Sequence, residues 1–258
     1  MKVRTIGSFA GAAVLAALLL SCSYLPEIAS GSINPSVTIT ETREAIVLTK
    51  GAPGPSTAGL MFYPGGLVDP HGYIPLLADL AAFGIPVVVA RAPGNLAVFS
   101  PNAGLGLRSL VPGVSKWVVG GHSLGGAMAA WSAHDNPGEY MGIVFLAAYP
   151  PDSKSLAAWP HPVLSISAEK DGLSTPAKID ATLPLLPSPQ KWLIDSDRTY
   201  PAASGSYAVL HQIPGGVHAQ FGSYGPQAGD GTPTISAADQ RAETVSYIVE
   251  FFTNNGWL

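Results

Sequence analysis

The sequence predicts an α/β protein with a doubly wound, mostly parallel sheet, and three observations support this fold class. Short apolar runs alternate with amphipathic stretches from about residue 58 onwards. Residues 87–89 and 143–146 are apolar on both faces, as strands are when helices cover both sides of a parallel sheet. The 24 prolines and 29 glycines follow no period and therefore separate many short elements. A chain of 258 residues is long enough for one such domain.

The first strands come before the alternation begins. Residues 37–40, 45–48 and 58–63 are β-branched or apolar, and a Pro-Gly-Pro turn at residues 53–55 precedes the third run. The alternating part then predicts, in order, helix 73–83, strand 86–90, helix 104–110, strand 116–120, helix 124–134 and strands 143–148 and 162–167.

The last part of the chain is expected to supply one more strand between two helices. Residues 175–183 are predicted to be helical, a proline-rich irregular stretch follows through about Ser206, and residues 207–213 form the last core strand. Ser236 opens a C-terminal helix as its N-cap, with an acidic residue three positions later. The apolar members of that helix should pack on the sheet: Val245, Ile248, Phe251 and Phe252.

Residues 1–21 have the pattern of a signal peptide. Lys2 and Arg4 precede an apolar run over residues 9–20. The run is shorter than the stretch of about 20 apolar residues that a membrane span needs. The alternative is a hydrophobic N-terminal helix of the domain.

Cys22, the only cysteine of the chain, follows this segment directly. Residues 19–22, Leu-Leu-Ser-Cys, resemble the lipobox of bacterial lipoproteins, which implies that Cys22 is lipidated and becomes the N-terminus. A lone thiol cannot form an internal disulfide, and lipidation would remove an exposed thiol in an oxidising compartment. The alternative is ordinary cleavage near Ser21 or Ser23.

The expected organisation is a signal peptide (residues 1–21), a lipidated cysteine with its tether (22–35) and one domain (36–258). We therefore expect an exported protein of the cell envelope, attached to a membrane by its lipid. Loss of residues 1–21 removes two basic residues and no acidic one, so the formal net charge goes from −4 to −6. With no basic stripe, nucleic acid is excluded as a partner. Nothing in the sequence indicates an oligomeric state.

The sharpest chemical signal is Gly121-His122-Ser123-Leu124-Gly125, a G-x-S-x-G between an apolar strand and an alanine-rich helix. An abrupt turn from strand to helix holds its serine in a strained conformation, and the glycines allow close packing. The Ser123 hydroxyl then stands at a helix N-terminus, where negative charge is favoured. The alternative is a glycine-rich turn with serine as N-cap. His122 is expected to point away and to be a packing residue.

In this context the chain resembles the α/β-hydrolase superfamily, and in outline its small lidless esterases and dienelactone hydrolases, over roughly residues 58–253. The resemblance implies the α/β-hydrolase fold and a catalytic triad in the chain order nucleophile, acid, base. Ser123 is then the nucleophile.

The resemblance places the histidine base in a loop after the last strand. His218 lies in a glycine-rich segment just beyond residues 207–213 and is the candidate. His211 lies within the strand pattern and stays open as an alternative, as does His71.

The acid should follow the strand expected at residues 162–167. Asp171, which precedes a glycine there, is the candidate, although an aspartate at that place also suits an ordinary turn. Glu169 is its nearest competitor, followed by Asp195 and Asp197.

An oxyanion hole needs two N–H donors that meet the charge developing on the acyl oxygen. The residue after the nucleophile, Leu124, supplies the first. The second should come from residues 63–67, Tyr-Pro-Gly-Gly-Leu, where similar enzymes carry a His-Gly turn. Gly66 is our choice and Leu67 the alternative.

These residues predict an enzyme that cleaves a small-molecule carboxylic ester through an acyl-enzyme on Ser123. Only residues 149–161 separate the two strands between which many relatives insert a cap, so a lid should be absent or minimal and short acyl chains favoured. An open cleft is expected to be lined by Tyr63, Leu67, His71 and Phe221. Cleavage of lactones, amides or thioesters by the same triad, or a non-catalytic surface binding protein, stays an alternative. No cofactor or metal is expected, because the glycine patterns and ligand spacings that bind them are missing.

Overall fold

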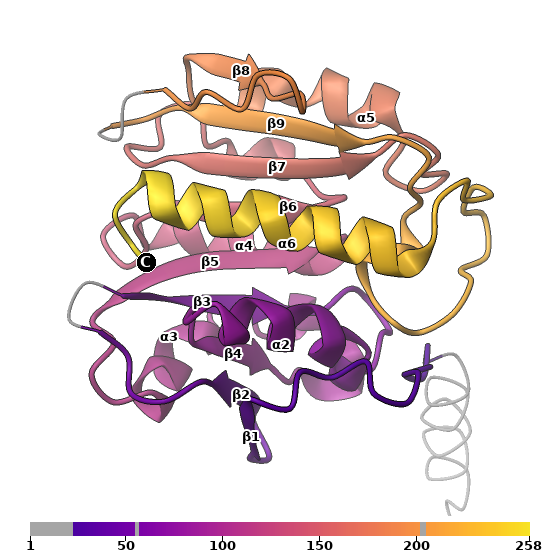
Figure 1. The fold of residues 1–258 in the computed structure, drawn as a ribbon. Helices are drawn as coiled ribbons and strands as arrows, with labels where there is room; N and C mark the ends of the chain where they lie inside the picture. The colour runs from indigo at the N-terminus through magenta and orange to yellow at the C-terminus, as the bar shows by residue number, and fades with distance from the viewer. Residues whose placement is uncertain (1–22, 55–56, 202–204) are drawn as a thin grey trace, which may run out of the picture.

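A nine-stranded mixed sheet organises the part of the chain that the structure, a computed structural model, describes: residues 23–54, 57–201 and 205–258 (Figure 1). The strand order is β1-β2-β4-β3-β5-β6-β7-β9-β8. The strands from β4 to β8 along this order run parallel, and β1 and β2 add two antiparallel pairings at one edge. The strands are β1 (Thr38–Glu41), β2 (Ala45–Thr49), β3 (Ala58–Tyr63), β4 (Val87–Ala90), β5 (Lys116–His122), β6 (Ile143–Leu146), β7 (Val163–Ala168), β8 (Gln190–Trp192) and β9 (Ala208–Ile213).

Helices cover both faces of the sheet. In Figure 1, α2 (Ile74–Ala82) and α6 (Ala237–Asn254) cross the front, while α3 (Ala103–Leu107) and α4 (Leu124–Asp135) lie behind. The fifth labelled helix is α5 (Pro176–Ala181). Short 3-10 segments complete the chain: η1 (Pro70–Tyr73), η2 (Pro93–Asn95), η3 (Ala97–Phe99), η4 (Arg108–Leu110), η5 (Asp152–Lys154), η6 (Leu183–Leu185) and η7 (Ala219–Phe221).

The side chains of each strand divide between two cores, one on each face. In β3, Phe62 packs into the core that α2 and α6 cover, while Tyr63 packs into the core on the α4 side. Burying a large apolar side chain such as that of Phe62, which is 1% exposed, stabilises the fold by about 1.5–3 kcal/mol. These cores explain why strands with two apolar faces are needed, and the predicted fold class is confirmed.

Two features differ from the expectation. The stretch between α5 and β9 was expected to be irregular, but residues 190–192 form β8, which pairs in parallel with β9 at the edge of the sheet. The strand has only three residues and is largely exposed, so it leaves almost no hydrophobic pattern. The helix expected at residues 104–110 is divided into α3 and η4. Between β6 and β7 the only helical element is η5, so no helical cap is inserted there, as expected.

The described chain starts near the carboxyl ends of the parallel strands (Figure 1). Residues 23–35, expected to be a tether, lie against the domain. The Tyr24 N–H donates to the carbonyl of Leu67 (2.8 Å), and the Tyr24 carbonyl accepts from the N–H of Asp69 (2.9 Å). The Glu27 N–H donates to the carbonyl of Ser223 (2.7 Å). The first described residues therefore connect the loop after β3 with the loop after β9.

The predicted signal peptide and Cys22 lie outside the described residues. Within the described ranges, no helix combines the length and the apolarity that crossing a membrane requires.

Candidate active site

Ser123 lies at the sharp junction between β5 and α4, with φ 52° and ψ −125°. A positive φ is unfavourable for a residue with a side chain and costs on the order of 1–3 kcal/mol. The Ser123 N–H donates to the carbonyl of Leu146 in the neighbouring strand (3.0 Å), which helps to hold this conformation. A Cβ atom on Gly125 would lie 2.1 Å from the Tyr63 carbonyl oxygen, and one on Gly121 would lie 2.5 Å from the carbonyl carbon of Gly125. The two glycines of the motif are therefore required by close backbone packing.

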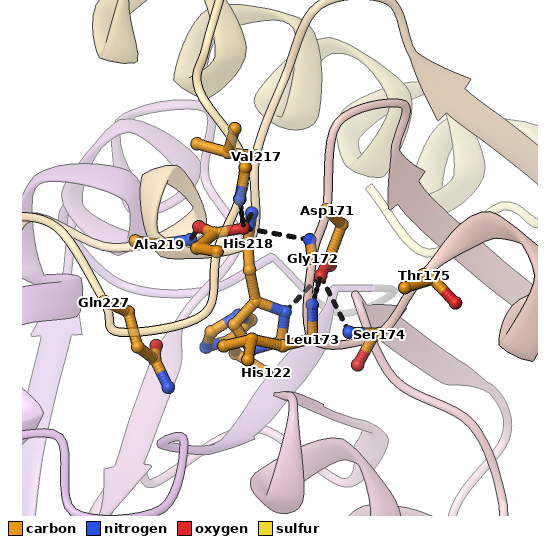
Figure 2. A network of polar contacts seen from close by, with 12 residues as sticks. His122, Asp171, Gly172, Leu173, Ser174, Thr175, Val217, His218, Ala219 and Gln227 are labelled. Atoms are coloured by element: carbon orange, nitrogen blue, oxygen red, sulfur yellow. Dashed lines mark hydrogen bonds and ion pairs between the residues drawn. The ribbon is translucent and has the colours of Figure 1, made fainter.

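His218 and Asp171 form a buried pair, with 2.8 Å between Nδ1 and Oδ2 (Figure 2). Their side chains are 1% and 0% exposed. The second oxygen of Asp171 accepts the N–H groups of Leu173 and Ser174, each at 2.7 Å. A carboxylate partner assigns the proton to Nδ1, and Nε2 is then free to accept one. The structure therefore brings together His218 and Asp171, the candidate base and the candidate acid of the sequence analysis.

The Nε2 atom of His218 is buried and has no hydrogen-bond partner among the described residues. Buried polar atoms in proteins are nearly always paired, so an unpaired acceptor is a candidate functional atom. The ring of His122, the residue before Ser123, lies 4.4 Å from the His218 ring between centroids. The hydroxyl of Ser123 is not bonded to Nε2 in this conformation. Such contacts are often long before substrate binds.

Gly66 and Leu124, the two expected oxyanion donors, lie in contact beside the elbow. Leu124 is the first residue of α4, and a Cβ atom on Gly66 would lie 2.9 Å from Cδ2 of Leu124. Neither the Gly66 N–H nor the Leu124 N–H has an acceptor in the described part of the chain. The N–H of Leu67, the alternative donor, is bonded to the carbonyl of Asn95 (2.8 Å). The geometry thus favours Gly66 over Leu67 as the second donor.

Tyr73 supports this arrangement and was not identified from the sequence. Its buried hydroxyl accepts the N–H of Gly65 (3.0 Å) and is hydrogen-bonded to Nδ1 of His122 (2.8 Å). Burial lowers the pKa of His122 far below its usual range, and the nearby His218 lowers this pKa further. His122 is therefore a neutral packing residue that also carries a hydrogen bond. Burial in turn raises the pKa of the Tyr73 hydroxyl.

Gln240 of α6 is a second residue that the sequence analysis did not identify. Its side chain accepts the N–H of Val217 (2.9 Å) and donates to the carbonyl of the same residue (2.8 Å). The segment immediately before His218 is thereby fixed to the helix (Figure 2 shows Val217 above His218). Gln240 is fully buried and shares a helix face with Thr244 and Ile248. The sequence signal that could have identified Gln240 is a polar residue at a position on the buried face of the C-terminal helix.

The structure does not bring the four expected cleft residues together. Tyr63 is 1% exposed, and its hydroxyl donates to the carbonyl of Pro101 (2.7 Å). It is the last residue of β3 and belongs to the core on the α4 side. Phe221 is also buried and packs near the His122 ring. The two ring nitrogens of His71 contact the carboxylates of Asp69 and Glu41. Leu67 is partly exposed; its N–H donates to Asn95, and its carbonyl accepts from Tyr24.

The alternative base and acids are bound elsewhere. His211 is 4% exposed, its Nε2 lies 2.6 Å from Glu243, and its ring stacks on Tyr247 at 3.7 Å. Glu169 accepts the N–H of Gly215. Asp195 and Asp197 bind groups near them in the sequence: Arg198, Thr199 and Lys191.

A cavity of about 460 Å³ lies beside the site, and neither Ser123 nor Asp171 lines it. Its walls come from residues 27–32 and 217–233, from Leu76 of α2 and from the start of α6. Among the described residues, no group of histidine, cysteine and acidic side chains could hold a metal ion.

Comparisons with known proteins agree with this fold. A model of the "Alpha/beta hydrolase family" matches residues 59–242. The sequence matches none of the curated proteins with which it was compared.

Several solved structures share the fold. Esterase 2 of Thermogutta terrifontis, phosphoramylated by tabun, is 15% identical with a TM-score of 0.57, covering 87% of this chain and 96% of its own. Dienelactone hydrolase from Anabaena variabilis is 15% identical with a TM-score of 0.53, covering 84% and 95%. Est1E from Butyrivibrio proteoclasticus is 11% identical with a TM-score of 0.53, covering 84% and 99%.

Proposed function

This chain belongs to the alpha/beta hydrolase family, and from that premise we propose that it is a serine hydrolase that cleaves carboxylic esters. The observation that carries the proposal is the buried pair of His218 and Asp171 beside the strained elbow of Ser123. A serine becomes a nucleophile when a base takes its proton, and a third group must orient that base.

The proposed reaction has two steps. The Ser123 hydroxyl attacks the acyl carbon while Nε2 of His218 takes its proton, and the same proton then passes to the leaving alcohol. Asp171 stabilises the imidazolium, and the N–H groups of Leu124 and Gly66 meet the negative charge on the acyl oxygen. Water, activated by His218, then cleaves the acyl-enzyme and releases the acid.

The similar structures add support for ester chemistry, since they include esterases and a dienelactone hydrolase. One of those esterases was phosphoramylated by an organophosphorus compound. We propose that Ser123 reacts with such electrophiles in the same manner.

A fluorophosphonate probe with mass mapping of the labelled peptide tests this proposal. We expect the label on Ser123 and a loss on the order of 10⁶ in kcat in Ser123→Ala, because triad members act as a unit. Ser109→Ala, a change in an exposed serine, serves as the matched control and should keep full labelling and activity. A Ser123→Ala enzyme with a tenth of the normal ester hydrolysis would exclude the serine mechanism.

We further propose a preference for short acyl chains. Without a cap, a methylene that stays in water gains none of the roughly 0.8 kcal/mol that its burial would contribute. The test is to measure kcat/KM for p-nitrophenyl esters from acetate to palmitate, with each ester kept below the concentration at which it forms micelles. Lactone, amide and thioester analogues are assayed in parallel. A maximum at long chains or activation at a lipid interface would contradict the preference.

The localisation is proposed on the sequence pattern alone. Residues 1–21 would be removed as a signal peptide, and a lipid on Cys22 would hold the exported protein at a membrane of the cell envelope.

A further inference from the structure

One carboxylate, that of Asp230, connects the loops that carry the two members of the buried pair. The acid loop comprises residues 169–175, between β7 and α5, and the histidine loop comprises residues 214–235, between β9 and α6. Oδ1 of Asp230 accepts the N–H of Gly172 in the acid loop (3.2 Å) and the N–H of His218 (3.2 Å). Oδ2 accepts the N–H of Ala219 (2.8 Å).

We propose that Asp230 is a positioning residue, which sets the distance and angle between His218 and Asp171. Its effect on hydrolysis rests on the function proposed above. Its effect on the pair itself does not, because the 2.8 Å contact between His218 and Asp171 is a property of the folded chain.

The segment around Asp230 is fitted closely to the acid loop. A Cβ atom on Gly231 would lie 1.8 Å from the carbonyl oxygen of Lys170, and one on Gly172 would lie 2.2 Å from the carbonyl oxygen of Gly229. Gly231, which follows Asp230, and Gly172 in the acid loop therefore let the two backbones approach each other. Its carboxylate can then bond both loops at once.

A carboxylate suits this place better than a neutral side chain. Besides the three N–H groups of the two loops, Oδ1 also accepts the N–H of Gly231 (2.8 Å). Hydrogen bonds from N–H groups to an ionised acceptor are shorter and stronger than neutral ones. The N–H groups of His218 and Ala219 stand at the beginning of η7, where no helical acceptor is available to them. Without Asp230 these donors would lose this acceptor, and the carboxylate link between the N–H groups of His218 and Gly172 would be lost.

The consequence for catalysis follows from the distances involved. The proposed base must act on Ser123 through Nε2 while Asp171 holds Nδ1, so a small displacement of the His218 backbone affects both contacts. A misplacement of about 1 Å in a catalytic group costs on the order of 10²-fold in rate. Because the proposed effect of Asp230 is on the position of His218, the loss should fall on kcat and leave KM nearly unchanged.

The experiment compares Asp230→Ala and Asp230→Asn with the wild type. Asparagine keeps one acceptor oxygen and can retain the bonds of Oδ1, but its amide group cannot accept the N–H of Ala219. We expect kcat to fall on the order of 10²-fold in Asp230→Ala and clearly less in Asp230→Asn. Asp197→Ala and Asp197→Asn are the matched controls, because Asp197 also accepts a backbone N–H in an exposed loop, that of Thr199. Both controls should keep the kcat of the wild type.

A second readout does not depend on activity. The proton on Nδ1 of His218, bonded to Asp171, should give a far-downfield proton resonance in the folded wild type. We expect this resonance to be lost or broadened in Asp230→Ala, retained in part in Asp230→Asn and unchanged in the Asp197 variants. Circular dichroism establishes that each variant is folded. If Asp230→Ala does not fold, Asp230→Asn decides the question by the same two readouts.

Unchanged kcat and an unchanged resonance in a folded Asp230→Ala protein would overturn the proposal. A change confined to KM, or an equal fall of kcat in the Asp197 controls, would also overturn it. If Ser123→Ala hydrolyses esters as well as the wild type, the proposed function fails by itself. The resonance then still decides whether Asp230 positions the pair.

Discussion

The ring of His122 lies 4.4 Å from the ring of His218, with 48° between their planes. Two imidazolium ions at this separation would repel each other. Burial, first, and the nearby His218, second, hold the pKa of His122 far below its usual range, and its Nδ1 is hydrogen-bonded to the hydroxyl of Tyr73. A neutral ring therefore lies against the proposed base, where it can pack on the imidazolium that forms during the reaction.

The depressed pKa of His122 predicts a dependence of stability on pH. The unfolded chain protonates this histidine near pH 6.5, whereas the folded protein keeps it neutral. The contribution of neutral His122 to the free energy of unfolding is thus fully present above about pH 6.5. It is lost as the pH falls below that value, by up to about 1.4 kcal/mol for each pH unit. Urea unfolding between roughly pH 5 and pH 7.5 should show a shallower pH dependence in His122→Asn. Parallel curves for the two proteins would contradict this expectation.

The acid is tested by comparing Asp171→Asn with Glu169→Gln. An asparagine can hold the imidazole in the wrong tautomer, so we expect a loss on the order of 10⁴ in kcat at Asp171. Glu169 is exposed and bonds the N–H of Gly215, so its variant should keep most of the activity. Steady-state kinetics decide between them, and equal losses would reassign the acid.

Tyr73→Phe should affect stability and catalysis together. It removes the hydroxyl that pairs Gly65 with His122 and leaves two buried groups unpaired, at a cost of about 1–3 kcal/mol each. Gly65 precedes the proposed donor Gly66, so kcat should fall while KM changes little. Tyr207→Phe is the control, since its hydroxyl bonds only Asn255 among the described residues. A Tyr73→Phe enzyme that loses stability but keeps its kcat would mean that Tyr73 has no influence on the oxyanion donors.

Cys22→Ser tests the proposed anchor. Acyl chains contribute about 0.8 kcal/mol for each buried CH₂ group, so the variant should move from the membrane fraction to the soluble or unprocessed fraction. The measurements are fractionation of cells of the native host and incorporation of labelled fatty acid into the protein. Wild-type protein found entirely in the soluble exported fraction would disprove lipidation.

The sequence predicted most of the sheet because its strands are apolar on both faces and its helices are separated by clear turns. It also indicated Ser123, His218 and Asp171 as candidates, because motif and chain order specify where such residues lie, and the structure pairs His218 with Asp171. Tyr63 was wrongly expected in an open cleft, since alternation along β3 turns its side chain to the core opposite to that of Phe62. Tyr73 and Asp230 could not be predicted. Their contacts join segments that are far apart in the chain, and such contacts exist only once the loops are folded.

The pairing of Tyr24 with the chain just beyond Gly66 has a consequence for where catalysis takes place. Only one residue separates Tyr24 from Cys22, and two residue steps of extended chain span at most about 7 Å. On the proposed anchoring, the acyl chains would enter the bilayer close to the proposed oxyanion donors. No flexible linker would then allow the domain to rotate relative to the membrane. The enzyme would then work at a fixed height and orientation over the lipid headgroups, and its substrates would reach it by lateral diffusion or through the thin layer of water at the membrane surface. A flexible insert between Cys22 and Ser23 would raise the domain away from the bilayer while leaving every catalytic residue in place.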